Sequence, residues 1–149
     1  MFSSAASAAP AIVDDSAEAA VKRLHESLST EQRQQVCFAW DHVDEKRGLL
    51  RARVAANWYV TGPRVRSEFY TPAQQRLVRE VFEGLVQRDW TARFDKQLRD
   101  DAEGFGDQSI AIFGAPGAGK FQFVITGRHI TLRCDGGSAA ELAFGGPIF

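Results

Sequence analysis

The spacing of apolar residues predicts helices in the first two thirds of the chain. Apolar residues three and four positions apart form one stripe of an amphipathic helix. Two such stripes consist of Ala17, Ala20, Val21, Leu24 and Leu28, and of Leu77, Val78, Val81, Phe82, Leu85 and Val86. Trp90, Phe94 and Leu98 lie four apart and predict a further helix that begins near Asp89.

Short capping motifs indicate where three helices begin. Thr71-Pro72-Ala73-Gln74 places Thr at the N-cap, Pro at the first helical position and Gln at the third. Ser29-Thr30-Glu31-Gln32 has the same capping-box spacing and predicts a helix that leads to Val36, Phe38 and Trp40. Asp15 and Glu18 also have this spacing, so we expect Asp15 to cap the first helix.

From residue 109 onward the apolar period changes from the helical value to two, which is typical of strands. Alternating, β-branched and aromatic residues predict strands at 109–113, 121–126 and 129–134. Helices followed by antiparallel strands predict the α+β class, with N-terminal helices and a small antiparallel sheet that contains a hairpin at residues 121–134.

The hairpin has a predicted register. Gly127-Arg128 suits a two-residue type II′ turn with glycine first, which would pair Ile125 with Ile130. One face of the hairpin is then apolar. The opposite, polar face pairs Gln122 with Arg133 and Thr126 with His129, Val124 facing Thr131 between them. A slip by one residue would mix the two sets.

The segment from Gly114 to Phe121 resembles a phosphate-binding loop but lacks two of its requirements. Gly114, Gly119 and Lys120 match G-x-x-x-x-G-K-[ST], whereas Phe121 cannot supply the hydroxyl that binds Mg²⁺. The loop must also open a helix, and a predicted strand follows here. We therefore expect a glycine-rich connection between two strands, and no nucleotide.

Composition narrows the function classes. The 149 residues are 44% hydrophobic and 25% charged, which suits one globular domain with a core. Their formal net charge of −1 gives no overall signal for nucleic acid, and no apolar run approaches the roughly 20 residues of a membrane span. We expect neither a nucleic-acid partner nor a membrane span. Cys37 and Cys134 form no CxxC pair and are expected to be small buried residues.

The ends of the chain are unusual. Residues 1–13 are low in complexity and lack the basic region of a secretory signal, so we expect a flexible tail. Residues 14–149 are expected to form a single α+β domain. The chain stops on the apolar residues Pro147-Ile148-Phe149, so we expect the natural protein to continue beyond them.

Candidate catalytic residues lie on the predicted polar face. His129 could act as a general base or bind a metal through one ring nitrogen, and Arg133 shares its face. The alternative is an ordinary solvated sheet face. We assign ligand contacts to Gln122 on the same face, and to Trp58 and Arg47 in the long connection before it.

That connection, from Asp41 to Tyr70, offers a candidate metal site. Asp41-His42, with Asp44 and Glu45, gathers oxygen and nitrogen donors for a divalent cation. The alternative is a solvated loop in which the acids pair with Lys46-Arg47. The arginines at positions 51, 53, 64 and 66, near Trp58, could instead bind an anionic ligand or single-stranded nucleic acid, although the neutral net charge argues against the latter.

A series of short motifs occurs in a distinctive order. They are Phe38-Ala39-Trp40-Asp41-His42 through Arg47, Asn57-Trp58, the helix start at 71–75, Ile112-Phe113-Gly114, Gly127-Arg128-His129-Ile130-Thr131-Leu132, and Phe144-Gly145-Gly146-Pro147. Over roughly residues 15–149 this order resembles the bacterial family catalogued as Domain of Unknown Function 3500. In many relatives the hairpin reads Gly-His-His, whereas Arg128 precedes His129 here, so a role that needs both histidines does not transfer.

The resemblance implies an extent and a location but no reaction, because the family has no established activity. Relatives continue well past the position of Phe149, and many carry an export signal, which implies a periplasmic or secreted protein. Two function classes remain. The favoured one is an extracytoplasmic domain that binds a small molecule or a protein partner. The alternative is a metal-assisted hydrolytic enzyme that uses His129 with Asp41 and His42.

Overall fold

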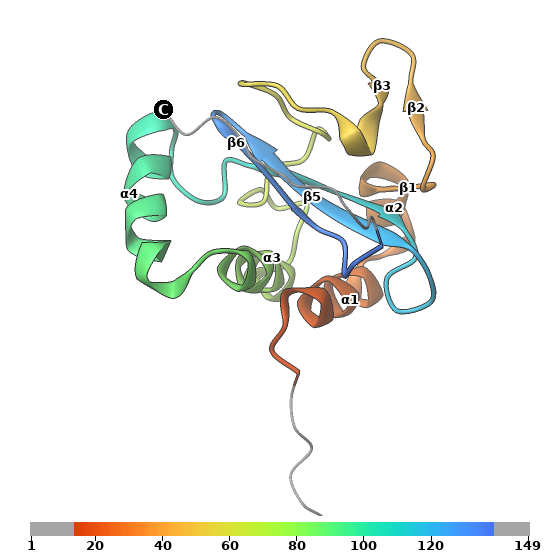
Figure 1. Cartoon of the computed structure of the whole chain (residues 1–149), viewed down its shortest axis with the longest axis horizontal. Coiled ribbons are helices and arrows are strands. Elements are labelled where there is room, and N and C mark those ends of the chain that lie inside the picture. Colours follow the sequence, from red (N-terminus) through yellow and green to blue (C-terminus); the bar gives the residue numbers. More distant parts are fainter. Residues whose placement is uncertain (1–13, 139–149) are drawn as a thin grey trace, which may run out of the picture.

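Helices come first and the main sheet follows in the computed structural model of this protein, which describes residues 14–138 (Figure 1). The helices are α1 (Ala17–Ser27), α2 (Thr30–Val36), α3 (Pro72–Leu85) and α4 (Thr91–Asp101), with short 3₁₀ turns η1 (Leu50–Ala52) and η2 (Arg88–Trp90). The strands are β1 (Cys37–Phe38), β2 (Val43–Asp44), β3 (Gly48–Leu49), β4 (Ser109–Gly114), β5 (Phe121–Gly127) and β6 (Ile130–Cys134). The predicted α+β class is confirmed. The predicted N-terminal tail and the residues from Phe144 lie outside the described range.

Capping boxes begin two of the predicted helices. Ser29 caps α2 and Thr71 caps α3, and in each box the glutamine at the third helical position returns to the cap backbone. These two glutamines, Gln32 and Gln74, also bond to each other through their side-chain amides at 2.9 Å, which ties the two helix starts together. The prediction for α1 was wrong by one residue. Its N-cap is Ser16, whose hydroxyl accepts the backbone N–H of Ala19.

The main sheet has the strand order β1-β4-β5-β6. β4, β5 and β6 are antiparallel neighbours, as predicted. The short β1, which pairs in parallel with β4, takes the place where the second helix was expected to continue through Phe38, and the β2–β3 pair was not predicted either. The glycine-rich segment after Gly114 joins β4 directly to β5, so a strand rather than a helix follows Lys120, as expected. No described helix has the length and apolar content needed to cross a membrane.

The hairpin of β5 and β6 forms, but its predicted register was wrong. Ile125 pairs with Leu132 rather than with Ile130, and Gly127 pairs with Ile130, so the turn is Arg128-His129. Contacts between the hairpin tip and the connection explain why this register forms. The N–H of His129 donates to the carbonyl oxygen of Ala56 at 2.7 Å, and Arg128 forms a β-bridge with Asn57. Pairing moved by two residues, so every strand side chain kept its predicted face.

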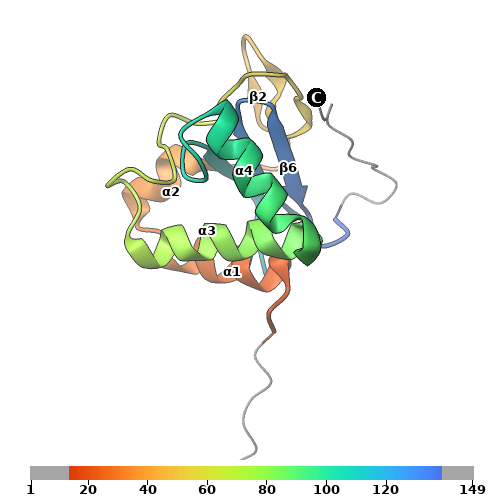
Figure 2. The ribbon, with the colours of Figure 1, turned by 90° about the vertical axis from the view of Figure 1, so that its left-hand side faces the viewer.

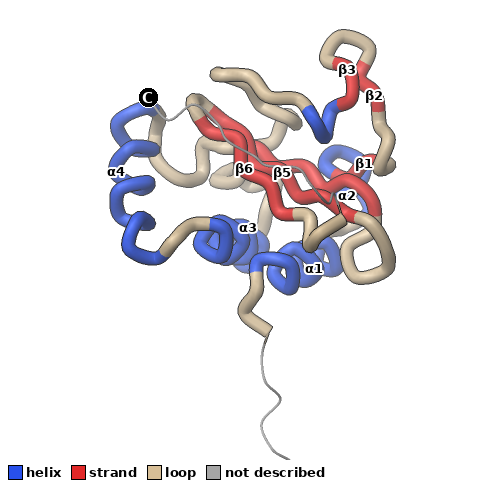
Figure 3. Tube along the Cα trace, viewed as in Figure 1, coloured by secondary structure: helices blue, strands red, loops and turns tan. Residues whose placement is uncertain are grey.

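Both faces of the sheet are covered. Helices α1 and α3 run side by side beneath one face, where Ile110, Ile112, Phe123 and Ile125 are fully buried (Figure 2). The connection crosses the other face, and its Leu50, Trp58 and Val60 pack on Ala111, Phe113 and Val124 (Figure 3). The predicted polar face is therefore a buried interface rather than a solvated surface.

Candidate functional site

His129 lies at the tip of the β5–β6 hairpin. Its φ of 57° is in the left-handed region, which is uncommon for a residue with a side chain and costs energy unless the surroundings hold it. Two contacts hold it here. Its backbone bonds to Ala56, and its ring Nδ1 lies 3.2 Å from Oδ2 of Asp101, the last residue of α4. Both side chains are 29% exposed.

The His129–Asp101 pair borders a small cavity of about 40 Å³ between the hairpin tip and α4. Its other walls are Phe94, Gln97, Leu98, Arg128 and Ile130. This volume accommodates a water molecule. Because a carboxylate only accepts hydrogen bonds, Asp101 favours the tautomer with the proton on Nδ1 and leaves Nε2 for proton transfer. Asp101 was missed by the sequence analysis, since only the tertiary fold brings the end of α4 to the hairpin.

Arg133 does not lie beside His129 in a shared polar site. It is buried opposite Val124, and its guanidinium donates hydrogen bonds to the backbone carbonyls of Arg51, at 3.0 Å, and Arg53. Burial lowers the pKa of Arg133. These two hydrogen bonds therefore hold the connection on the sheet.

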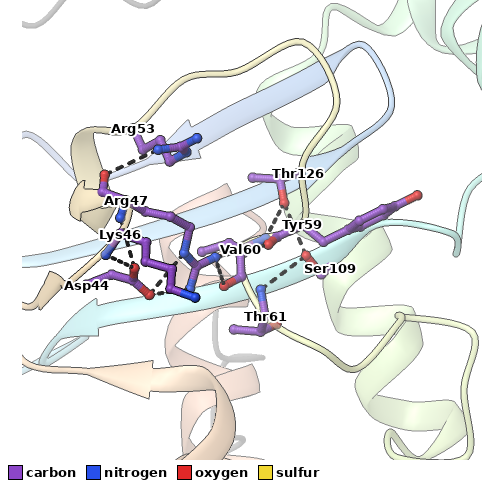
Figure 4. A network of polar contacts seen from close by, with 9 residues as sticks. All are labelled: Asp44, Lys46, Arg47, Arg53, Tyr59, Val60, Thr61, Ser109 and Thr126. Atoms are coloured by element: carbon purple, nitrogen blue, oxygen red, sulfur yellow. Dashed lines mark hydrogen bonds and ion pairs between the residues drawn. The ribbon is translucent and has the colours of Figure 1, made fainter.

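Trp58 and Arg47, the predicted ligand contacts of the connection, are engaged within the fold. The Trp58 ring is 7% exposed and its indole N–H donates to Oγ1 of Thr131 at 3.0 Å. The guanidinium of Arg47 donates to a carboxylate oxygen of Asp44 at 2.8 and 3.0 Å, and to the carbonyls of Tyr59 and Val60. Figure 4 shows how Arg47 reaches from the β2–β3 turn to Tyr59 and Val60, farther along the connection.

The same view shows how the connection is fastened to the sheet (Figure 4). The backbone N–H of Val60 donates to Oγ1 of Thr126 at 2.9 Å, and the hydroxyl of Ser109 lies 3.1 Å from the same oxygen. Thr61 donates its hydroxyl to the carbonyl of Ile110 at 2.7 Å. Thr126 and Ser109 are completely buried, so these bonds replace water that the groups would otherwise bind.

Gln122, the third predicted ligand contact, lies on the covered face and is 1% exposed. Neither its amide oxygen nor its amide nitrogen has a hydrogen-bond partner in the part of the chain that the structure describes. A buried amide without a partner is destabilising, so Gln122 is a weak point of this interface.

The predicted metal cluster does not assemble. The side chain of Asp41 is 84% exposed and lies 4.0 Å from Arg51, while the His42 ring packs 4.7 Å from the ring of Phe38. The hydrogen bond from Arg47 lowers the pKa of Asp44 to about 2. Within residues 14–138 no three His, Cys, Asp or Glu side chains gather in a geometry that could hold a metal ion. Asp41, His42 and Asp44 instead each lie against a different residue, namely Arg51, Phe38 and Arg47.

Comparisons of the chain with protein-family models, with curated proteins and with solved structures found no match. The resemblance to the Domain of Unknown Function 3500 family accordingly stays a prediction.

Proposed function

We propose that this protein is a binding domain that docks another protein through the ribbon formed by β2 and β3. The observation that carries the proposal is a pair of exposed apolar residues, Val43 and Leu49, which face each other across the ribbon. They are 64% and 37% exposed, and Val54 nearby is 53% exposed. Of the large apolar side chains exposed within residues 14–138, only Trp90 lies elsewhere. We call Val43, Leu49 and Val54 the ribbon patch.

The ribbon is held firmly, which favours binding because little conformational freedom is lost on docking. Leu50, the residue after β3, is fully buried against the sheet. Arg47, in the ribbon turn, bonds to two carbonyls of the connection. The Arg51 guanidinium lies 4.2 Å from the centre of the Trp40 ring and donates to the Trp40 carbonyl. The ribbon patch is therefore displayed on a rigid support.

The chemistry of the ribbon indicates the kind of partner. Only two strands form this sheet, so each has an outer edge with unpaired backbone groups, to which an extended chain can add. Exposed charges of both signs surround the patch, including Asp41, Glu45 and Lys46. A polyanion would meet the acids, whereas a protein segment with apolar residues and mixed charges would match both features. We therefore propose that the partner is a protein that contributes an extended strand.

The test is site-specific photo-crosslinking in the cells that produce the protein. A benzophenone side chain at position 49 is expected to give one discrete adduct, and Val43→Lys should abolish it. Trp90→Lys is the matched control, because it also replaces an exposed apolar residue with a charge but lies outside the patch. No adduct, or an adduct unaffected by Val43→Lys, contradicts the proposal. An adduct of twice the chain mass identifies a second copy as the occupant and rejects a distinct partner.

Acid–base catalysis at His129 is a second candidate, favoured by the carboxylate of Asp101 on its Nδ1. In this reaction a water in the adjoining cavity would give a proton to Nε2 as its oxygen attacks an ester carbonyl, and the imidazolium would return the proton to the alkoxide as the ester C–O bond breaks, which releases an acid and an alcohol. Hydrolysis of an activated ester should fall at least about 100-fold in His129→Ala. Asp101→Asn should lower the rate further than His25→Ala, which replaces a histidine of α1 that does not line the cavity. Unchanged hydrolysis in His129→Ala excludes this candidate.

A further inference from the structure

A separate open groove runs beside α3, away from both sites described so far. It has a volume of about 360 Å³. Its walls are Val65, Arg66, Pro72, Arg76, Arg79 and Phe105, completed by Gln75 and Gly106. This size lies within the range of small-molecule sites. Three arginines and no acidic residue line it, although the whole chain is nearly neutral.

The floor of the groove is apolar and fixed. Val65 is 2% exposed, and its backbone N–H donates to the carbonyl of Gln108 at 2.9 Å. The neighbouring N–H of Arg66 donates to the carbonyl of Gly106 at the same distance. Gly106 has a φ of 119° that a side chain would strain, and an added Cβ would lie 3.0 Å from Cβ of Arg66. The two segments that form the floor are thus packed as closely as their backbones allow.

The three arginines differ in how far they are engaged. Arg79 donates to Asp95 at 2.6 and 2.9 Å and to Glu83 at 2.7 Å, and its guanidinium lies 5.0 Å from the centre of the Phe105 ring. Arg66 forms ion pairs with Glu103 and Asp107. Arg76 also lines the groove from α3, is exposed, and has no hydrogen bond or ion pair with any residue from 14 to 138.

We propose that this groove binds a small organic carboxylate whose apolar body rests on Val65, Pro72 and Phe105 while its carboxylate pairs with Arg76. A planar guanidinium matches a carboxylate with two parallel hydrogen bonds. Arg79 and Arg66 are each paired with two acids of their own, so Arg76 is the cation of the groove wall that remains for the ligand. An apolar floor with one free cation at its rim favours an aromatic or aliphatic acid over a neutral or cationic molecule.

The beginning of α3 argues against a phosphate site. Phosphate sites at helix starts use free backbone N–H groups. Here Pro72 has no N–H, and the N–H groups of Gln74 and Gln75 already bond to the side chain and carbonyl of Thr71. Because the cap has taken these donors, the groove offers one unpaired guanidinium rather than a cradle of amides. This donor set fits a monoanionic carboxylate better than a phosphate dianion.

The test uses phenylacetate, its neutral amide phenylacetamide, and inorganic phosphate, each titrated into the full chain at constant ionic strength. Amide chemical shifts in NMR spectra report binding. Phenylacetate is expected to shift the resonances of Arg66, Gln75 and Gly106 with saturation, whereas the other two probes are not. Arg76→Gln should raise the Kd at least about tenfold, because a charge-assisted pair is lost. Arg99→Gln, which changes an exposed arginine of α4 outside the groove, should leave the Kd unchanged.

Arg76→Lys separates a paired guanidinium from mere positive charge. It should weaken phenylacetate binding nearly as much as Arg76→Gln, since an ammonium cannot form the two parallel bonds. The proposal is overturned if phosphate or phenylacetamide shifts the same resonances equally, if Arg76→Gln binds like the wild type, or if no saturable shift occurs. None of these readouts involves the ribbon or His129, so failure here leaves the proposed partner-binding function standing.

Discussion

Replacing Thr126 by valine should detach the connection from the sheet more than the equivalent change in its cross-strand partner, Thr131. The two threonines pair across β5 and β6, and each accepts one hydrogen bond from the connection. Thr126 accepts the N–H of Val60 at 2.9 Å, and Thr131 accepts the indole N–H of Trp58 at 3.0 Å. They differ in burial, because Thr126 is completely buried and Thr131 is only half-buried.

This difference in burial sets the expected magnitudes. Valine has nearly the shape of threonine, so Thr126→Val leaves the buried N–H of Val60 without an acceptor, which costs about 1–3 kcal/mol. The contact with Ser109 is also lost, which adds about 1 kcal/mol. We expect the free energy of unfolding to fall by about 2–4 kcal/mol. Thr131→Val should cost only about 0.5–1.5 kcal/mol, because the hydrogen bond that it removes is only partly buried.

Urea unfolding followed by tryptophan fluorescence and by circular dichroism gives both free energies. The slope of the free energy of unfolding against urea concentration should stay unchanged, since neither variant alters how much surface becomes exposed on unfolding. Hydrogen exchange at the Val60 amide should accelerate in Thr126→Val and not in Thr131→Val. A loss in Thr131→Val equal to or larger than that in Thr126→Val would refute the argument that burial of the bond decides its contribution.

Three further outcomes are expected. Gly114→Ala should cost at least about 2 kcal/mol in urea unfolding, because φ is 78° and the new Cβ would lie 2.1 Å from a backbone oxygen; Gly119→Ala, which meets open space, should be nearly neutral. Burial raises the pKa of the Cys134 thiol to about 12, so at pH 8 a thiol reagent should label it only after denaturation, and rapid labelling of the folded protein would contradict this. The pKa of Asp44 is lowered to about 2 by Arg47, below its unfolded value of about 3.9. Its contribution to stability is thus present above about pH 4 and lost as pH falls toward 2, so the difference between wild type and Asp44→Asn should shrink over that range; a constant difference would contradict it.

Local signals in the sequence determined the four helices and the three longest strands of the described residues, β4 to β6. The capping boxes at Ser29 and Thr71 act within four residues, so they could be recognised without any tertiary information. The change of period at residue 109 likewise placed β4 to β6 to within one residue at each end. β1, β2 and β3, each only two residues long, had no such signal. β1 exists because β4 provides a partner for it.

The sequence also determined which face each strand side chain occupies, but not the register. Side chains alternate with a period of two, so Ile125 has the same face whether it pairs with Ile130 or with Leu132. Contacts of the hairpin tip with Ala56 and Asn57 selected the second pairing and moved His129 into the turn. Those residues are about 70 positions away in the chain, beyond the reach of any local pattern.

The candidate sites show the same division most clearly. Sequence could single out His129 as a chemically capable residue. Which segments pack together decided its partner Asp101 and the burial of Gln122 and Arg133. Alternation alone predicted a solvated polar face, because a strand pattern records that one face is less apolar but not what covers it. Long-range packing covered that face with the connection. The chain therefore carries the local geometry in its sequence, and only the tertiary structure decides which polar groups remain available to a ligand or a partner.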